Sequence, residues 1–422
     1  MLYPMKIVVI GSGLIGVTAA YFLKRRGHEI TVLDRQQGPG RETSFANGAL
    51  LTPSMPEPWN APGSWRVLLG SLARSDSGLQ LRLRALPSLG RWGASFLRNS
   101  KPALFERNTI RNLHLALFSL KVMQSLRRET QVEYGGVAPG SLKLFRNHGA
   151  LKDAIIVANR LLREGLTFRQ LSRDETVARE PALTAVAEQL AGAIFYPTDE
   201  TGDAYRFCVA LADYARQQGV EFRFRTGVSS LELRSGRVTA VVSERERLVA
   251  DQYVVAAGSY STPLLRPLGI RLPVRPAKGY SVTFNPQRTE GALKVPLVDD
   301  DWHAAVVPVG RAIRVAGTAE FAGFDLSLRP ERVRNLVNLA QSILPRAGLD
   351  AATAQPWCGL RPMSADGVPI VGPTAISNLW VNTGHGHLGW TMAAGSGQLL
   401  AELMSGDSPS IDCAPYELKR FV

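Results

Sequence analysis

The sequence predicts an α/β fold in which a Rossmann-like nucleotide-binding domain is interwoven with an α+β domain built on an antiparallel sheet. Residues 6–34 have the pattern of a β-α-β unit with a glycine turn after its first strand. From about Gly140 the pattern changes to short β-branched and aromatic runs, which are typical of antiparallel strands. Strands expected at residues 237–242 and 252–256 then rejoin the nucleotide fold. The two regions therefore alternate along the chain.

The first unit begins with an apolar run of strand length, Lys6–Ile10, and continues with a helical pattern from Leu14 to Arg26. A second strand, Glu29–Leu33, follows the helix. The longest apolar stretch near the N-terminus lies inside this unit. Its regularly spaced glycines and its lack of a basic leader argue against a signal peptide or a membrane span. We therefore expect a cytoplasmic protein without a transmembrane anchor.

Three glycines fill the GxGxxG pattern between the first strand and the helix. Gly11 permits the tight turn, Gly13 lets the backbone approach a pyrophosphate, and Gly16 lets the helix pack closely against the strand. The N-terminus of the helix presents free N–H groups and a partial positive charge to phosphates. Asp34, at the end of the second strand, is placed to accept a hydrogen bond from a ribose hydroxyl. These features together predict a dinucleotide site.

Two further glycine elements lie far downstream and favour FAD over NAD. Val255-Ala-Ala-Gly258 ends a predicted strand, and the segment from Asn382 to Trp390 contains three glycines before an apolar helix. The N-terminus of that helix can direct its dipole at the pyrimidine edge of a flavin. Glycine elements at both ends of the chain suit an extended cofactor, and Asp34 disfavours the 2′-phosphate of NADP.

Further strands and helices are expected between these elements. The expected strands are 141–145, 192–196, 221–224, 278–284, 304–308, 312–316 and 379–382, and the expected helices are 205–218 and 388–404. They divide the chain into a discontinuous FAD-binding domain and a substrate-binding and helical basic region. The first comprises residues 1–64, 150–175, 201–262 and 350–422, and the second comprises residues 65–149, 176–200 and 263–349.

The composition is that of an ordinary soluble protein, but its positive charge is concentrated in one segment. Of a net charge of +13, residues 66–128 contribute +10, from twelve basic and two acidic side chains. Leucine and tryptophan are interleaved with these charges, and residues 65–130 have a helical pattern. Such helices suit the surface of an anionic membrane; the alternative is that they are the solvated faces of ordinary domain helices. Nucleic acid is a weaker partner, because no aromatic stacking platform accompanies the charge.

Arg361 is the first candidate for substrate binding. Held between leucine and proline, it can bind a substrate carboxylate through a bidentate pair of hydrogen bonds, or it can form a structural salt bridge. Tyr260 and Tyr280 are candidate hydroxyl donors, although tyrosine on a strand more often serves packing. His385 and His387 flank the last glycine turn without nearby acidic residues, so no metal site is expected there.

The three cysteines, Cys208, Cys358 and Cys413, lie far apart in the sequence and form no CxxC pair. This spacing argues against a disulfide framework and a zinc site, and it favours a reducing compartment.

With these residues identified, the chain resembles the D-amino acid oxidase superfamily of FAD enzymes. Within it, the chain is most similar to the FAD-bearing small subunit of bacterial D-amino acid dehydrogenases. The resemblance covers nearly the whole chain. The segments that carry it are Val8-Val-Ile-Gly-Ser-Gly13, Glu42-Thr-Ser-Phe-Ala-Asn47, Pro58-Trp-Asn-Ala-Pro-Gly63, Asp199-Glu-Thr-Gly-Asp203, Gly258-Ser-Tyr-Ser-Thr262, Lys278-Gly-Tyr-Ser281, Gly359-Leu-Arg-Pro-Met363, Asn382-Thr-Gly-His-Gly386 and Leu388-Gly-Trp-Thr-Met392.

The resemblance implies a GR2-type fold that binds FAD non-covalently. It also implies oxidation of a small D-amino acid to its imino acid, with hydride transfer from Cα to flavin N5, followed by hydrolysis to a 2-oxo acid and ammonia. Dehydrogenase members pass the electrons to a respiratory-chain acceptor, such as a quinone or an electron-transfer partner. The basic segment, residues 65–128, would then contact the cytoplasmic face of the inner membrane peripherally.

The resemblance also assigns the site residues. Arg361 falls where members of the superfamily bind the substrate carboxylate. Arg361 and Tyr280 are expected to be catalytic, and His385 joins them in binding the substrate. The expected cofactor-binding residues are Ile10, Gly11, Gly13, Leu14, Ile15, Gly16, Asp34, Arg35, Ser44, Asn47, Val228, Ala257, Gly258, Gly386, His387, Leu388, Gly389 and Trp390.

Two departures from the family pattern keep alternatives open. The loop at residues 50–57 differs from the best-known members near the substrate, so D-proline or D-hydroxyproline is an alternative substrate. Cys358 raises the question of a covalent flavin, as in some sarcosine oxidases, but the nearer relatives hold FAD non-covalently, and we expect this cysteine to be a buried small residue. The other hypotheses are an oxygen-using oxidase of glycine, sarcosine or D-amino acids, a flavin-binding scaffold and, more remotely, an NAD-dependent dehydrogenase.

Overall fold

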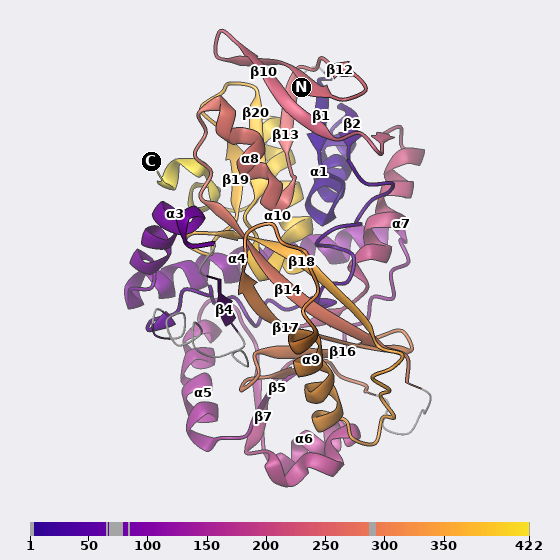
Figure 1. Ribbon diagram of the computed structural model, residues 1–422, viewed down its shortest axis with the longest axis vertical. Helices are drawn as coiled ribbons and strands as arrows, with labels where there is room; N and C mark the ends of the chain where they lie inside the picture. Colours follow the sequence, from indigo (N-terminus) through magenta and orange to yellow (C-terminus); the bar gives the residue numbers. More distant parts are fainter. Residues whose placement is uncertain (1–3, 65, 67–78, 83–84, 287–292, 422) are drawn as a thin grey trace.

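The computed structural model describes residues 4–64, 66, 79–82, 85–286 and 293–421. The molecule has two halves along its long axis (Figure 1). One half is built on a six-stranded sheet and the other on a nine-stranded sheet. The chain passes between the halves several times, which confirms the predicted interwoven α/β fold.

The six-stranded sheet has parallel neighbours except for one antiparallel pair at its edge. Its order is β19 (Ile370–Pro373), β20 (Leu379–Thr383), β13 (Gln252–Val255), β1 (Lys6–Ile10), β2 (Glu29–Leu33) and β9 (Glu221–Arg223). β1 lies inside the sheet, and four of its five residues are buried. A strand covered on both faces needs such a continuous apolar run. The predicted β-α-β unit is therefore confirmed.

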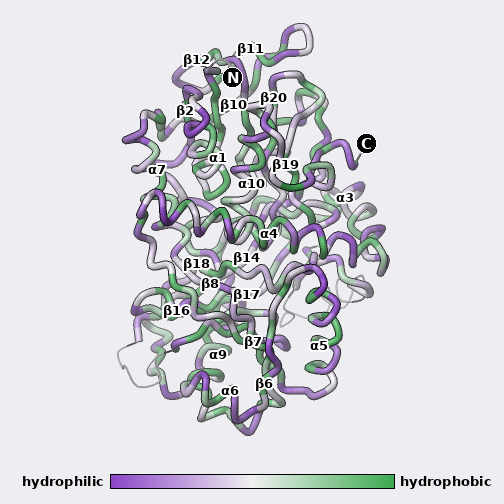
Figure 2. Tube along the Cα trace, turned by 180° about the vertical axis from the view of Figure 1, so that it is seen from behind, coloured by the Kyte–Doolittle hydropathy of each residue, from purple (hydrophilic) through white to green (hydrophobic). Residues whose placement is uncertain are grey.

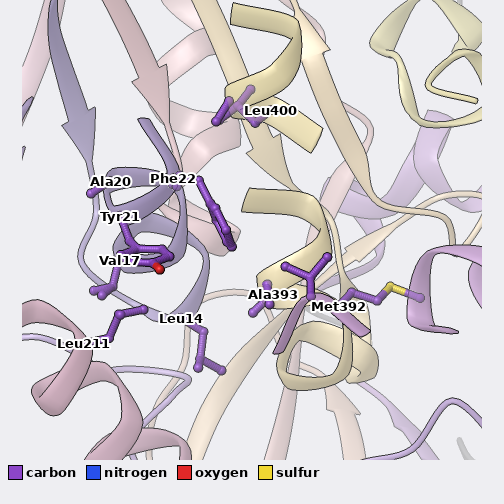
Figure 3. Packing of buried hydrophobic residues seen from close by; sticks show 14 of the residues in the cluster. Leu14, Val17, Ala20, Tyr21, Phe22, Leu211, Met392, Ala393 and Leu400 are labelled. Carbon is purple, nitrogen blue, oxygen red and sulfur yellow. The ribbon is translucent and has the colours of Figure 1, made fainter. Parts of the chain in front are cut away.

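Four helices form the core beside this sheet. They are α1 (Leu14–Arg25), α4 (Pro102–Thr130), α7 (Ala204–Gln217) and α10 (Gly389–Met404). Figure 3 shows apolar side chains of α1, α7 and α10 in one buried cluster. The helices predicted at residues 14–26, 205–218 and 388–404 are confirmed to within a residue or so at their ends.

Small residues on α10 let two helices approach it closely. A Cβ on Gly397 would lie 2.9 Å from the carbonyl carbon of Thr18 on α1, and a Cβ on Gly395 would lie 2.7 Å from Cβ of Ser119 on α4. The Thr18 hydroxyl also donates to the carbonyl of Ala393, at 3.0 Å. α10 is thereby fixed between α1 and α4, so its N-terminus has a defined position.

The nine-stranded sheet contains all of the strands expected for the antiparallel region. Its order is β18 (Gln355–Ser364), β14 (Val274–Phe284), β17 (Ala312–Phe321), β16 (Ala304–Val309), β15 (Leu297–Asp299), β5 (Ser141–Phe145), β7 (Gly192–Tyr196) and β6 (Arg169–Leu171), with β4 (Leu79–Leu81) beside β17. β6 and β18 fall in the predicted FAD-binding ranges 150–175 and 350–422 but pair within this sheet. The predicted division is therefore wrong for these two strands, because long-range pairing determines their place. It is also wrong for α4, which was predicted in the second region but packs in the core beside the six-stranded sheet.

The strand predicted at residues 237–242 forms but does not enter the nucleotide sheet. It is β11 (Arg237–Ser243), which pairs with β10 (Val228–Arg234) and β12 (Arg247–Leu248) in a separate antiparallel sheet. Its apolar face packs on the six-stranded sheet, in a cluster that includes Val238, Val241 and Tyr253. The last small sheet pairs β3 (Leu50–Leu51) with β8 (Glu200–Thr201). The other α-helices of the described residues are α3 (Leu86–Arg98), α5 (His148–Leu162), α6 (Arg173–Arg179), α8 (Ser261–Leu265) and α9 (Pro330–Ile343).

The basic segment is only partly helical. Residues 79–81 form strand β4 rather than a helix, because β17 offers them backbone hydrogen-bonding partners. On α3, Trp92 and Phe96 are buried against Phe321, and the Trp92 indole donates to the carbonyl of Met363. These aromatic residues therefore serve the core instead of facing a membrane. Residues 65, 67–78 and 83–84 of the segment lie outside the described residues.

α4 crosses the back of the molecule with alternating hydrophilic and hydrophobic residues (Figure 2). Its buried positions include Leu115, Met123 and Leu126, which belong to the same core cluster as α10. Among the helices of the described ranges, none is long and apolar enough to cross a membrane.

Candidate active site

A cavity of about 1330 Å³ extends from the six-stranded sheet to the nine-stranded sheet. It is larger than most single-ligand pockets, so it can hold an extended cofactor and a substrate together. All but two of the predicted site residues line it. The exceptions are Gly16 and Leu388. Gly16 packs beneath the glycine turn, and Leu388 is buried in the hydrophobic core.

The first two glycines of the GxGxxG turn line one end of the cavity. Gly11 has a φ of +107°, and a Cβ there would lie 2.6 Å from the carbonyl oxygen of Ala256. A Cβ on Gly16 would lie 1.8 Å from the carbonyl oxygen of Gly11. No acidic residue occupies the first turn of α1. The N–H of Leu14 donates to Ser44 Oγ at 3.2 Å, which leaves the next N–H groups of the turn to meet an anion.

Asp34 lies beside this turn and lines the cavity. Its Oδ2 accepts hydrogen bonds from the backbone N–H and the hydroxyl of Ser12, at 2.7 and 2.6 Å, and its Oδ1 accepts from the N–H of Gln36 at 2.8 Å. The carboxylate is thus held rigidly at the end of β2. A carboxylate oxygen has more than one lone pair, so a ribose hydroxyl can still donate to it.

The N-terminus of α10 forms another wall of the cavity. Asn382 Oδ1 and both ring nitrogens of His385 are buried without a hydrogen-bond partner among the described residues. Burial lowers the pKa of His385 to about 3 and that of His387 to about 4, and the charge of Arg361 contributes to the second shift. Both imidazoles are therefore neutral at physiological pH. Unpartnered polar groups of this kind suit a bound molecule that supplies the missing hydrogen bonds.

Arg361 lies on β18 and lines the cavity. Its Nη1 donates to the carbonyl of Thr318 at 3.3 Å, and its guanidinium lies 5.3 Å from the ring centre of Trp59. The Trp59 ring is in turn stacked on His387, with 5.6 Å between ring centres. Within the described part of the chain, no carboxylate lies within ion-pair distance of Arg361. Burial lowers its pKa to about 10, so the side chain stays charged at neutral pH.

Two backbone features hold this guanidinium in place. A Cβ on Gly279 would lie 2.0 Å from Nη1 of Arg361, so the guanidinium rests directly on the glycine. Gly279 pairs with Ala319, and Tyr280 pairs with Gly317, which leaves Thr318 as the extra residue of a β-bulge. Thr318 has a φ of +49°, a left-handed conformation that is unusual for a β-branched residue. Such local strain is concentrated at functional sites.

Tyr280 borders the cavity, but its hydroxyl is directed elsewhere. It donates to Oε2 of Glu320 at 2.9 Å, in a buried cluster where Glu320 also contacts Lys278, Arg82 and Arg329. Burial raises the pKa of Tyr280, and Glu320 adds to that effect. The single hydroxyl proton is therefore already engaged, and this geometry does not support the predicted role as a donor to substrate.

Tyr260 and Cys358, also considered from the sequence, lie in different surroundings. Tyr260 lies under the guanidinium of Arg35, 3.8 Å from ring centre to Cζ, at the cofactor end of the cavity. The Sγ of Cys358 donates to the carbonyl of Leu326 at 3.1 Å. Cys358 is partly exposed rather than buried as predicted, and it does not line the cavity.

Among the cavity residues that were assigned no role from the sequence are Trp59, Gly279, Thr318 and Trp357, although Trp59 and Gly279 stand in segments that carry the resemblance. A tryptophan or glycine in a strand has an ordinary packing explanation, and the bulge at Thr318 depends on pairing with a distant strand. Gly279 alone had a local indication, because a glycine inside a strand suggests a bulge or a close approach.

Comparison with known proteins identifies the family of this chain. Residues 6–403 match the model of the family described as FAD dependent oxidoreductase (DAO). The chain is 42% identical to a D-amino acid dehydrogenase of Paramagnetospirillum magneticum, over 99% of each chain. Among solved structures, glycine oxidase of Geobacillus kaustophilus is 22% identical with a TM-score of 0.76, and covers all of both chains. L-proline dehydrogenase of P. horikoshii is 18% identical with a TM-score of 0.77, over 100% of this chain and 98% of the other. These two structures share the fold.

The residues present fit FAD. The close approach allowed by Gly11 and Gly13 suits its pyrophosphate, and so does the start of α1, where Gly13 has no side chain to occupy the N-terminus. Asp34 suits its adenosine ribose. Asn382 and His385, whose polar atoms have no partner among the described residues, line the cavity near the N-terminus of α10 and can hydrogen-bond to the cofactor.

Proposed function

The chain belongs to the DAO family of FAD dependent oxidoreductases, and on that premise we propose that it oxidises small D-amino acids to 2-oxo acids through the imino acid. The bound flavin would supply the hydride acceptor, with flavin N5 receiving the hydride from the substrate Cα. The names of relatives at 40–44% identity support a D-amino acid as the substrate.

One observation carries this proposal. Arg361 presents a charged guanidinium to the cavity and has no carboxylate partner among the described residues, so its charge is left for a ligand. A buried unpaired charge is costly, and a substrate carboxylate can offset that cost through two charge-assisted hydrogen bonds. The structural salt bridge considered from the sequence is therefore the poorer explanation of Arg361.

The other residues orient the substrate. Trp59 packs against the guanidinium, and the Thr318 carbonyl holds Nη1, so the carboxylate is presented in a fixed direction. His385 and His387 are neutral, so they add no positive charge that would repel a protonated substrate amine. Holding the reacting carbon in place is the protein's main contribution to a hydride transfer.

We also propose that the electrons pass to a respiratory-chain acceptor at the inner face of the cytoplasmic membrane. In the described part of the basic segment, Arg91, Arg98, Lys101, Arg107 and Lys121 are exposed, although the apolar faces of their helices are buried. Contact with an anionic surface would therefore be electrostatic and salt-sensitive. Cosedimentation with phosphatidylglycerol vesicles at low and high salt tests it.

The function is tested by adding D-alanine, D-proline or D-hydroxyproline to the FAD-bound protein without oxygen and recording the visible flavin absorbance. Bleaching by a D-isomer and not by its L-isomer is expected. Bleaching by D-proline alone would select the cyclic substrates, and stoichiometric hydrogen peroxide in air would select an oxidase. A yellow protein that no D-amino acid bleaches would overturn the proposal.

A further inference from the structure

Five residues of β18 border the cavity, and three of them, Trp357, Gly359 and Arg361, share one face of the strand. They alternate along the strand, and alternate residues of a strand share a face. Gly359 pairs across the sheet with Gly279 of β14. The middle of this face is therefore a pair of glycines with no side chains, bordered along β18 by a tryptophan and an arginine.

The ends of these two side chains converge on the glycine pair. A Cβ on Gly359 would lie 2.2 Å from Cη2 of Trp357, and a Cβ on Gly279 would lie 2.0 Å from Nη1 of Arg361. Cβ positions of directly paired residues in an antiparallel sheet are about 5 Å apart. The indole and the guanidinium are therefore neighbours on one glycine floor, although their Cα atoms are four residues apart.

We propose that Trp357 determines substrate specificity, as the wall against which the side chain of the substrate packs. The inference rests on the proposed function, in which Arg361 binds the substrate carboxylate. The α-carbon is one bond from that carboxylate, so its substituent must lie within a few ångströms of the guanidinium. The indole occupies the adjacent place on the floor, and it limits the size of that substituent.

The wall is held at a fixed position relative to Arg361. The guanidinium is confined by Gly279, by the Thr318 carbonyl and by the Trp59 ring. The indole is confined because it lies directly on Gly359. Because the guanidinium and the indole are both confined, the space between them is fixed. The indole therefore limits the size of the substrate side chain.

The test compares Trp357→Ala and Trp357→Phe in the FAD-bound protein. Non-reacting carboxylates, acetate and benzoate, are titrated while the shift of the flavin absorbance gives each Kd. Trp302→Ala is the matched control, because Trp302 is 42% exposed and does not line the cavity. We expect Trp357→Ala to shift the ratio of the two Kd values toward benzoate by about tenfold or more, the size expected when a binding pocket is enlarged. Trp357→Phe should give a smaller shift, and Trp302→Ala none.

Turnover supplies a second readout, since kcat/KM for D-phenylalanine relative to D-alanine should shift in the same direction. An unchanged Kd ratio in Trp357→Ala, with flavin content and melting temperature retained, would overturn the inference. If Trp357→Ala does not retain FAD, an unchanged ratio in Trp357→Phe overturns it equally. If the Kd ratio shifts but no D-amino acid reduces the flavin, the inference about Trp357 is supported and the proposed function is overturned.

Discussion

The two ends of the cavity are built in different ways. At the nucleotide end, Gly11, Gly13 and Asp34 all come from the first β-α-β unit, within 24 residues of one another in the sequence. At the opposite end, Arg361 depends on Gly279 and Thr318, which lie on two other strands of the nine-stranded sheet. One end is encoded by local pattern, and the other by long-range strand pairing. Mutations at the two ends should therefore separate cofactor binding from substrate binding.

The largest effect is expected at the substrate end, for Arg361→Ala. Loss of two charge-assisted hydrogen bonds, each worth about 1.5–3 kcal/mol, should lower kcat/KM by roughly 10²–10⁴-fold. FAD should remain bound, because the glycine turn is untouched. Anaerobic flavin reduction with D-alanine measures the first effect, and the flavin-to-protein absorbance ratio measures the second. Full turnover in this variant would show that the carboxylate binds elsewhere.

Gly13→Ala should give the reverse result at the nucleotide end. A Cβ at this position meets only Ser44 Oγ, at 3.3 Å, so the fold tolerates it, but the methyl group occupies the space through which the pyrophosphate approaches. We expect FAD to bind about 100-fold more weakly, roughly 2.7 kcal/mol, as measured by fluorescence titration of the apoprotein.

Gly90→Ala is the control for Gly13→Ala, since nothing lies within 4 Å of a Cβ there. If the two variants bind FAD equally well, the glycine turn is only a packing turn.

The same contrast explains what the sequence could predict. Strands such as Lys6–Ile10 and Ser141–Phe145 were placed correctly, because their apolar runs have strand length and end at turns. β6 and β18 were assigned to the wrong region, because the sheet in which a strand pairs depends on partners far away in the sequence. The bulge at Thr318 could not be predicted for the same reason, since it exists only relative to β14.

Single residues show the same limit. The position of Arg361 was predicted through the family resemblance, whereas its supports, Trp59 and Gly279, come from a loop and a neighbouring strand. The predicted donor role of Tyr280 fails in this geometry because its hydroxyl donates to Glu320, a partner on the adjacent strand. Local pattern identifies a polar side chain but not the group that it contacts.

Gly279→Ala tests the supporting floor and should have a smaller effect than Arg361→Ala. The added methyl group must displace the guanidinium, which lies 2.0 Å from the ideal Cβ position, but the positive charge remains in the cavity. We expect KM for D-alanine to rise about tenfold, or about 1.4 kcal/mol, with little change in FAD content. Steady-state kinetics measure it, with Gly93→Ala on α3 as the control. An unchanged KM would mean that Arg361 can bind the carboxylate from more than one position.

The smallest effect on substrate and cofactor binding is expected where the two regions are joined, at Asp199. Its Oδ2 accepts hydrogen bonds from the hydroxyls of Ser54 and Ser141, at 2.5 and 2.6 Å, and so links the loop before Trp59 to β5. Burial raises the pKa of this carboxyl from 3.8 to about 7. A raised pKa favours the folded state while the group is protonated. This contribution is complete below about pH 4 and is lost as the pH rises toward 7.

Asp199→Asn removes the titration but keeps an oxygen acceptor. The melting temperature of the wild type, relative to that of this variant, should therefore fall by a few degrees between pH 4 and pH 8. The corresponding loss of unfolding free energy has an upper limit of about 4 kcal/mol for a pKa shift of this size. Thermal melts at constant ionic strength measure it, with Asp213→Asn as an exposed control. A difference that stays constant with pH would show that Asp199 is ionised throughout. The two regions would then be joined by a charged group, stabilised by the two hydroxyls against the cost of burial.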